Sequence, residues 1–152
     1  MSQGLRLALL GIWAGMLLAI GLVAIPAAFQ TLPGTELSAR LVGAALPTLD
    51  QAGLALAFAA VGLGWVGGAG RTRALLPGLG GAFHLTSLLW LAPRIHQIRE
   101  AAGGSVGRLG VDNPELELFA LLHNGSVALF VAAGVIALAT IAWDLLATIR
   151  KN

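Results

Sequence analysis

The sequence contains no cysteine and little charge, and both shortages restrict what the chain can be. Of its 152 residues, 11% are charged and 57% are hydrophobic, and the mean hydropathy is +0.86. Soluble domains carry about 25% charged residues, so this composition excludes an ordinary soluble domain. The absence of cysteine excludes disulfides, thiolate chemistry and metals bound by thiolates.

Other patterns are missing as well. No run of Lys and Arg with interleaved aromatic residues indicates a nucleic-acid partner. Segments of about ten residues that alternate in polarity, as in membrane β-barrels, do not occur. The remaining class is a helical membrane protein, with the lipid bilayer as its surroundings.

Four long segments without Asp, Glu, Lys or Arg fit that class: 7–35, 51–70, 74–93 and 118–143. Each reaches about 20 residues, the length that a helix needs to cross a bilayer. The first run is longer than the core of a signal peptide, which favours a retained helix. We predict an all-α, integral membrane four-helix bundle that forms a single transmembrane domain, 1–152. Its helices are expected at about 4–29, 44–66, 75–99 and 114–149.

Prolines and capping residues guide the helix boundaries. Pro47 either opens the second helix, which places Asp50 near its N-terminus, or kinks a longer helix that starts earlier. Pro26 should bend or loosen the end of the first helix. Asp112 and Glu115 form a D-x-x-E capping box, and Pro114 suits the first turn of the fourth helix.

The basic residues near the helix ends give the orientation. One side holds five of them and the other holds four: Arg6, Arg71, Arg73, Arg150 and Lys151 against Arg40, Arg94, Arg99 and Arg108. The side richer in Lys and Arg is expected to be cytoplasmic. We therefore predict a multi-pass protein of the cell membrane with both termini in the cytoplasm.

Gly11 and Gly15 form a GxxxG pair on a face of small residues in the first helix. Small residues let two helix backbones approach closely in lipid. This face predicts helix packing, either within the chain, which we favour, or as the seam of a homo-oligomer.

Polar side chains gather near one end of the predicted bundle. They form a candidate polar pocket that faces outward from the cell: Gln30, Asp50, Gln51, Arg94, His96, His123 and Asn124. Polar groups at membrane depth are costly and usually face a bundle interior or a cavity. Imidazole and carboxylate groups suit a transition metal, with Asp50, His96 and His123 as candidate ligands. The favoured alternative is structural: Asp50 pairs with Arg94, and the two histidines hydrogen-bond across helices.

His84 lies nearer the middle of the membrane. An axial haem ligand or a proton-relay step is possible for such a histidine, but a neutral buried imidazole bonded to a neighbouring helix is the better interpretation. Haem is disfavoured because no second histidine is expected at the same depth. Ser87 and Ser126 lie in no nucleophile motif, so we predict no enzyme and no cofactor beyond the possible metal.

Three stretches together resemble the transmembrane protein 205-like family: 23–29 (Val-Ala-Ile-Pro-Ala-Ala-Phe), 92–96 (Ala-Pro-Arg-Ile-His) and 121–126 (Leu-Leu-His-Asn-Gly-Ser). The resemblance implies a small four-helix membrane protein, with Pro26, Phe29, Pro93 and His123 at the family-defining positions. Asn124 departs from it, since a glycine is usual there. Eukaryotic members are linked to the handling of metal drugs, but the family implies no catalytic residues.

Two functions follow from the sequence. The first is a non-enzymatic membrane protein that binds or helps move a small solute, including a transition-metal ion. The alternative is an accessory or structural subunit that packs against a membrane partner or against itself.

Overall fold

The computed structural model describes residues 2–150, and these are almost entirely helical. In order, the elements are α1 (Ser2–Ala19), a π-helical turn η1 (Ile20–Ala24), α2 (Ile25–Thr31), α3 (Thr35–Val66), α4 (Arg71–Thr86), a second π-helical turn η2 (Ser87–Leu91), α5 (Ala92–Ala101), a 3₁₀ turn η3 (Val106–Arg108) and α6 (Pro114–Ile149). They join into four continuous rods, Ser2–Thr31, Thr35–Val66, Arg71–Ala101 and Pro114–Ile149. All four are long and apolar enough to cross a membrane, which confirms the predicted all-α membrane bundle.

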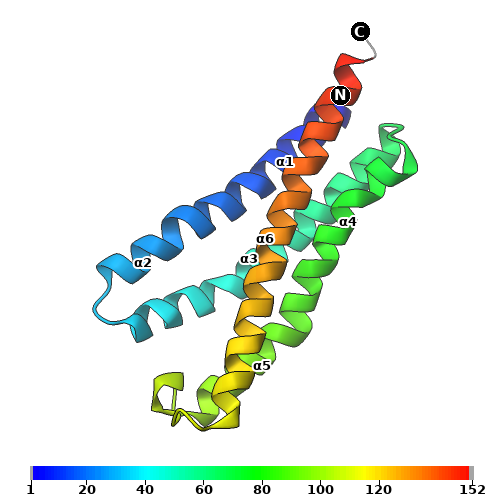
Figure 1. Ribbon diagram of the computed structural model, residues 1–152. Coiled ribbons are helices and arrows are strands. Elements are labelled where there is room, and N and C mark those ends of the chain that lie inside the picture. Colours follow the sequence, from blue (N-terminus) through cyan, green and yellow to red (C-terminus); the bar gives the residue numbers. More distant parts are fainter. Residues whose placement is uncertain (1, 151–152) are drawn as a thin grey trace.

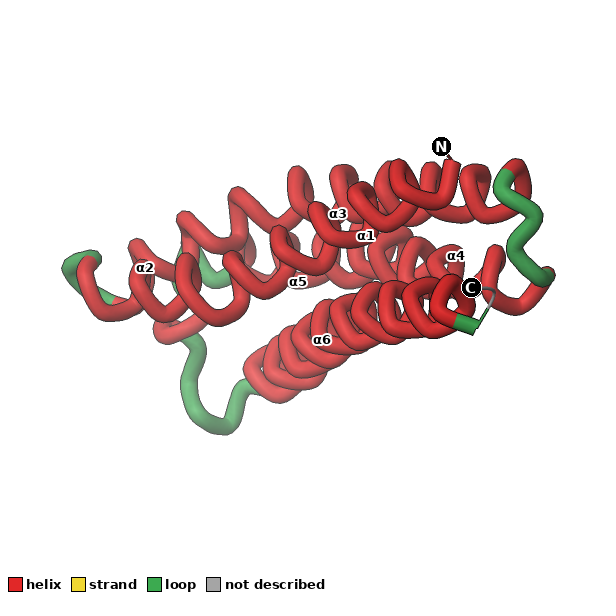
Figure 2. The backbone as a smooth tube through the Cα atoms, turned by 90° about the horizontal axis from the view of Figure 1, so that it is seen from above, coloured by secondary structure: helices red, strands yellow, loops and turns green. Residues whose placement is uncertain are grey.

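The rods form two hairpins that pack closely at one end and spread apart at the other (Figure 1), where side chains such as Arg99, which donates to the Ala39 carbonyl over 3.3 Å, still bridge them. The first hairpin is α1–α2 with α3, and the second is α4–α5 with α6. Figure 1 shows the start of α1 and the end of α6 near each other, at the end where the hairpins pack closely. Figure 2 shows the same helices, with the loops that join them, from above. The main core lies there: Leu10, Trp13, Ala14, Leu17, Ala57, Ala60, Ala133 and Ala137. A smaller core of Leu91, Ile98 and Leu122 holds the second hairpin at its far end.

The second rod begins earlier than the expected start at residue 44. It runs from Thr35 with Pro47 inside it, so Pro47 does not open the helix. A proline inside a helix lacks one hydrogen bond but does not end the helix when packing supports both sides. As a result, Asp50 lies near the middle of α3, far from the entrance where we expected it. The third rod also starts earlier, at Arg71, while the fourth has the predicted bounds.

Pro26 and Pro93 each follow a π-helical turn. Pro26 is the second residue of α2, after η1, and Pro93 is the second residue of α5, after η2. A proline ring clashes with the carbonyl four residues earlier and leaves it without a donor. Those carbonyls belong to Leu22 and Leu89, inside the two π turns, where the wider turn relieves the clash. The prolines therefore change the helical register of the first and third rods without ending them.

The predicted capping box at Asp112 is wrong by one residue. The N-cap of α6 is Asn113, whose side chain accepts a hydrogen bond of 2.9 Å from the Glu115 backbone N–H. Pro114 occupies the first turn, as predicted. Because Asn and Asp cap equally well, the sequence pattern alone does not choose between neighbours.

The expected packing of Gly11 and Gly15 within the chain is also not found. Both glycines are exposed, and a side-chain carbon at either position would meet no described atom within 4 Å. The face that they share with Gly4 and Ala8 points away from the other three rods. Backbone approach inside the bundle depends on other glycines, described below.

Candidate functional site

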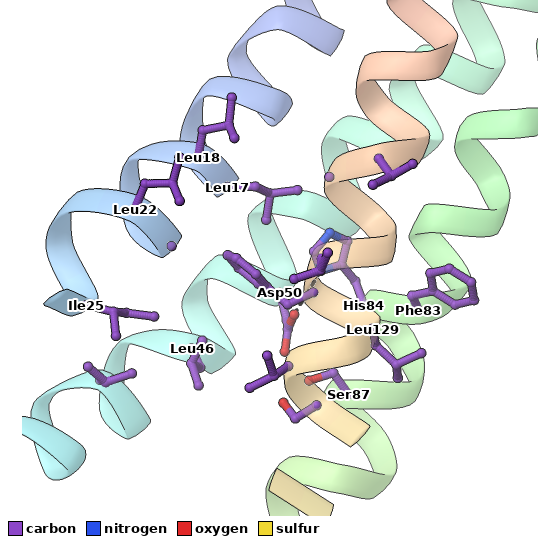
Figure 3. Close-up of a pocket in the computed structure, with 18 of the residues that line it drawn as sticks. Leu17, Leu18, Leu22, Ile25, Leu46, Asp50, Phe83, His84, Ser87 and Leu129 are labelled. Atoms are coloured by element: carbon purple, nitrogen blue, oxygen red, sulfur yellow. Dashed lines mark hydrogen bonds and ion pairs between the residues drawn. The ribbon is translucent and has the colours of Figure 1, made fainter. Parts of the chain in front are cut away.

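A cavity of about 500 Å³ lies between the two hairpins, where they begin to part. Its walls come from all four rods and are mainly apolar. They are formed by Leu17, Leu18, Gly21, Leu22, Ile25, Phe29, Val42, Leu46, Asp50, Phe83, His84, Ser87, His123, Ser126, Val127, Leu129, Phe130, Val131, Gly134, Val135 and Leu138. Figure 3 shows Leu17, Leu22 and Leu46 from the first hairpin opposite Phe83 and Leu129 from the second.

The cavity opens sideways between the first rod and α6. Its lining includes apolar side chains that are exposed on both edges, among them Leu22 (72%) and Val131 (57%). These residues lie well inside their rods, at a distance from the rod ends. The opening is therefore in the apolar part of the bundle, unlike the polar vestibule at one end that the sequence predicts.

Three side chains form a buried hydrogen-bonded chain on the inner wall. His84 Nδ1 lies 2.8 Å from Asp50 Oδ1, and the Trp13 indole N–H donates to His84 Nε2 over 3.1 Å. Trp13, His84 and Asp50 are 0%, 2% and 6% exposed. We call these residues the Trp13–His84–Asp50 chain; it links α1, α4 and α3, and its Asp50–His84 bond is drawn in Figure 3.

The two hydrogen bonds of His84 determine which of its ring nitrogens carries the proton. An indole N–H only donates, so His84 Nε2 must accept and cannot carry a proton. The proton of a neutral imidazole then lies on Nδ1, which donates to the Asp50 carboxylate. His84 thus has both nitrogens occupied, which agrees with the prediction of a buried histidine bonded to neighbouring helices.

Glycines make room for the two rings. The His84 ring lies directly against Gly53, where a side-chain carbon would overlap it. A side-chain carbon at Gly80 would come within 2.5 Å of the Trp13 ring. Small residues at these two points let the rods approach closely enough for the chain to form.

The structure brings together only part of the predicted polar pocket. Asp50 and His123 line the cavity, and His123 stacks on Phe119 with ring centroids 5.9 Å apart. The other predicted residues are exposed and outside the lining: Gln30, Gln51, Arg94, His96 and Asn124. The predicted Asp50–Arg94 pair is wrong, because the partner of Asp50 is His84.

The predicted metal ligands are not assembled either. His96 is on the exposed surface of α5, 3.1 Å from Glu100 one turn later, while Asp50 and His123 line the cavity. Among residues 2–150, no three side chains of His, Asp or Glu are close enough to hold a metal ion together. The three metal ligands predicted from the sequence, Asp50, His96 and His123, therefore do not form one site.

Sequence reasoning missed His84, Ser87 and Ser126 as parts of this site. The expected depths of the residues in the membrane were the cause. A second helix that starts near residue 44 puts Asp50 at the membrane surface, whereas His84 lies in the middle of the third helix. Counting from Thr35 gives the two residues similar depths on adjacent antiparallel rods. The alternative in which Pro47 kinks a longer helix predicts these similar depths.

A second buried polar cluster lies at the end with the chain termini. Arg6 contacts Asp144 at 2.9 Å, and Arg73 Nε lies 3.3 Å from Asp144 Oδ1. Arg6 also donates to the backbone carbonyls of Ala60 (3.0 Å) and Arg73 (2.6 Å). The Arg73 carbonyl lacks its helical donor because residue 77 is a proline, and Arg6 supplies a donor in its place.

We call Arg6, Arg73 and Asp144 the Arg6–Asp144 cluster. One Arg6 side chain joins α1 to α3, α4 and α6, which makes the cluster a structural tie between all four rods. The sequence assigns Arg6 to the membrane surface, but it is 3% exposed. Gly64 leaves the space for its guanidinium.

Comparison with known proteins gives one match. Residues 8–103 match the model of a family described as a domain of unknown function, DUF4149. The match covers the first three rods as far as the end of α5, and so includes Trp13, Asp50 and His84. No curated protein and no solved structure matches significantly. The match does not specifically support the transmembrane protein 205-like resemblance, which stays a prediction. With well over half of its length covered, the chain belongs to the DUF4149 family.

Proposed function

We propose that this protein is a non-enzymatic, multi-pass protein of the cell membrane that binds a small, largely apolar molecule in the cavity between its hairpins. The observation that carries the proposal is a cavity of about 500 Å³ with apolar walls and a buried Asp50–His84 pair on one side. The start of α1 and the end of α6 lie at the same end of the bundle, and the count of basic residues supports a cytoplasmic location for that end.

The cavity has the features of a small-molecule site. Such sites have volumes of about 300–1,000 Å³, apolar walls and a few polar groups that orient the ligand. Asp50, His84, Ser87, His123 and Ser126 supply those groups here. Because the opening lies between apolar rods, we infer that the ligand enters from the bilayer, with its polar part directed to Asp50 and Ser87.

The bonding of His84 supports a binding role over catalysis. A histidine that activates a serine needs a free ring nitrogen aimed at the hydroxyl. In this protein Nδ1 donates to Asp50 and Nε2 accepts from Trp13. His84 therefore has no nitrogen left with which to take a proton from Ser87.

Packing against a partner remains the second proposal, and one observation favours it. Gly11 and Gly15 on the small-residue face of α1 are exposed, and a side-chain carbon at either would meet no described atom of another rod within 4 Å. An accessory subunit that uses this face would bind a second copy or another membrane protein there. A transition-metal ion as ligand has less support, because the predicted ligands are not assembled.

A neutral fluorescent probe, 1-aminoanthracene, tests binding in the cavity. Gly134→Leu places a side chain into the cavity lining, and Gly125→Leu is the matched control on α6, where no described atom lies within 4 Å. We expect Gly134→Leu to weaken probe binding about tenfold or more, equivalent to about 1.4 kcal/mol. Gly125→Leu should leave it unchanged.

Equal binding by the wild type and both variants would show that the probe does not occupy the cavity. The second proposal has its own measurement, namely self-association or partner capture by Gly11→Leu and Gly15→Leu variants. Loss of association with normal probe binding would support the accessory role.

A further inference from the structure

The Trp13–His84–Asp50 chain places a carboxyl group without a cationic partner at the cavity wall. Its imidazole is neutral, since Nε2 accepts from Trp13 and the one proton on Nδ1 is donated to Asp50. A neutral imidazole orients the carboxylate but does not cancel its charge. With Asp50 ionised, the three side chains carry the charge of one carboxylate.

No other group in the cavity neutralises that charge. Asp50 is the only carboxylate among the lining residues described, and none of them is Lys or Arg. Only one Asp50 oxygen, Oδ1, has a hydrogen-bond partner within residues 2–150, although the residue is 6% exposed. The one other histidine in the lining, His123, is not within ion-pair distance of Asp50.

An isolated carboxylate in an apolar, membrane-depth site is costly, and either a proton or a counter-ion relieves that cost. A basic side chain serves this purpose in the Arg6–Asp144 cluster, but the cavity offers none. Phe29, Phe83 and Phe130 add aromatic faces to the same cavity, and aromatic faces attract cations.

We propose that the ligand is a lipophilic organic cation, an amine or onium compound whose positive centre pairs with Asp50 while its apolar groups fill the cavity. The inference rests on the proposed function and specifies its ligand class. His84 and Trp13 are positioning residues, because they hold Oδ1 and leave the second carboxylate oxygen for the ligand.

The test uses two ions of nearly the same size and shape and opposite charge, tetraphenylphosphonium and tetraphenylborate. Each competes with 1-aminoanthracene for purified protein in an uncharged detergent. With each ion's concentration expressed as its mole fraction in the detergent micelle, we expect the cation to displace the neutral probe at a level at least about tenfold lower than the anion. Asp50→Asn should abolish this preference, and the amide oxygen can still accept the His84 Nδ1–H bond, so that the hydrogen-bonded chain is retained in the variant.

Glu117→Gln is the matched control, since it removes an exposed carboxylate outside the cavity and should leave the preference intact. Equal competition by the two ions in the wild type, or a preference that survives Asp50→Asn, would overturn the cation inference while probe binding still supported the cavity. Absence of probe binding, with no competition by either ion, would overturn both proposals. If Asp50→Asn does not fold, the comparison of the two ions on the wild type still decides the question.

Discussion

His84 bonds to two other rods through its two nitrogens, and Gly53 is the residue that makes this possible. The ring lies against the Gly53 backbone, at a position where any side chain would overlap it. Gly80, on α4, leaves space for the Trp13 ring in the same way. The Trp13–His84–Asp50 chain therefore requires glycine at both positions.

Gly53→Ala is expected to destabilise the protein by about 1–3 kcal/mol, because the added methyl group forces the His84 ring out of position. The measurement is thermal or denaturant unfolding in detergent. Gly62→Ala is the control on the same helix, since a side-chain carbon there meets no described atom within 4 Å. Equal stability of the two variants would contradict the packing of His84 on Gly53.

At the scale of the element, helix boundaries agree with the sequence signals wherever those signals do not conflict. The bounds of α6 are as predicted, because an apolar run follows an N-cap and Pro114. Pro47 shows where two rules conflict. A proline usually marks a helix start, but here the apolar face on both sides continues, and α3 passes through it.

The N-cap of α6 gives a test at this scale. Asn113→Ala should destabilise the protein by about 1 kcal/mol, because the Glu115 N–H loses its acceptor. Asp112→Ala, one residue earlier, should change stability by less than about 0.5 kcal/mol. The comparison is made by unfolding midpoints under the same conditions. A larger effect at Asp112 would restore the capping box that the sequence predicts.

The sequence predicts the number of helices and the membrane class, since these follow from the length and apolarity of the segments. It does not predict which polar groups meet. Asp50 pairs with His84 and not with Arg94, and Arg6 reaches Asp144 from the other end of the sequence. Such pairs depend on the depth and rotation of each rod, and those are set by Pro47, the π-helical turns and the glycines at crossing points.

At the scale of the whole molecule, the Arg6–Asp144 cluster holds together the end at which the hairpins meet. Arg6 bonds to three other rods, and Asp144 receives contacts from both arginines. Both Arg6 and Asp144 are almost fully buried. No comparable ion-pair tie joins the hairpins at their far end among the described residues.

Asp144→Asn is expected to destabilise the bundle by about 3–5 kcal/mol, because two arginines lose their buried counter-ion. The measurement is the unfolding midpoint in detergent, with Asp112→Asn, an exposed loop position, as the control. An unchanged midpoint for Asp144→Asn would mean that the cluster does not hold the hairpins together.

The sideways opening of the cavity has a consequence for how affinity must be measured. Under the proposed function, a ligand that enters between the first rod and α6 would come from the bilayer, so its relevant concentration would be its mole fraction in lipid. Added lipid then competes with the protein by dilution. For a strongly partitioning ligand at fixed total amount, occupancy should fall as the lipid-to-protein ratio rises, even though the site itself is unchanged. Apparent dissociation constants expressed per litre of water would rank ligands by their partition coefficients as much as by their fit to the cavity.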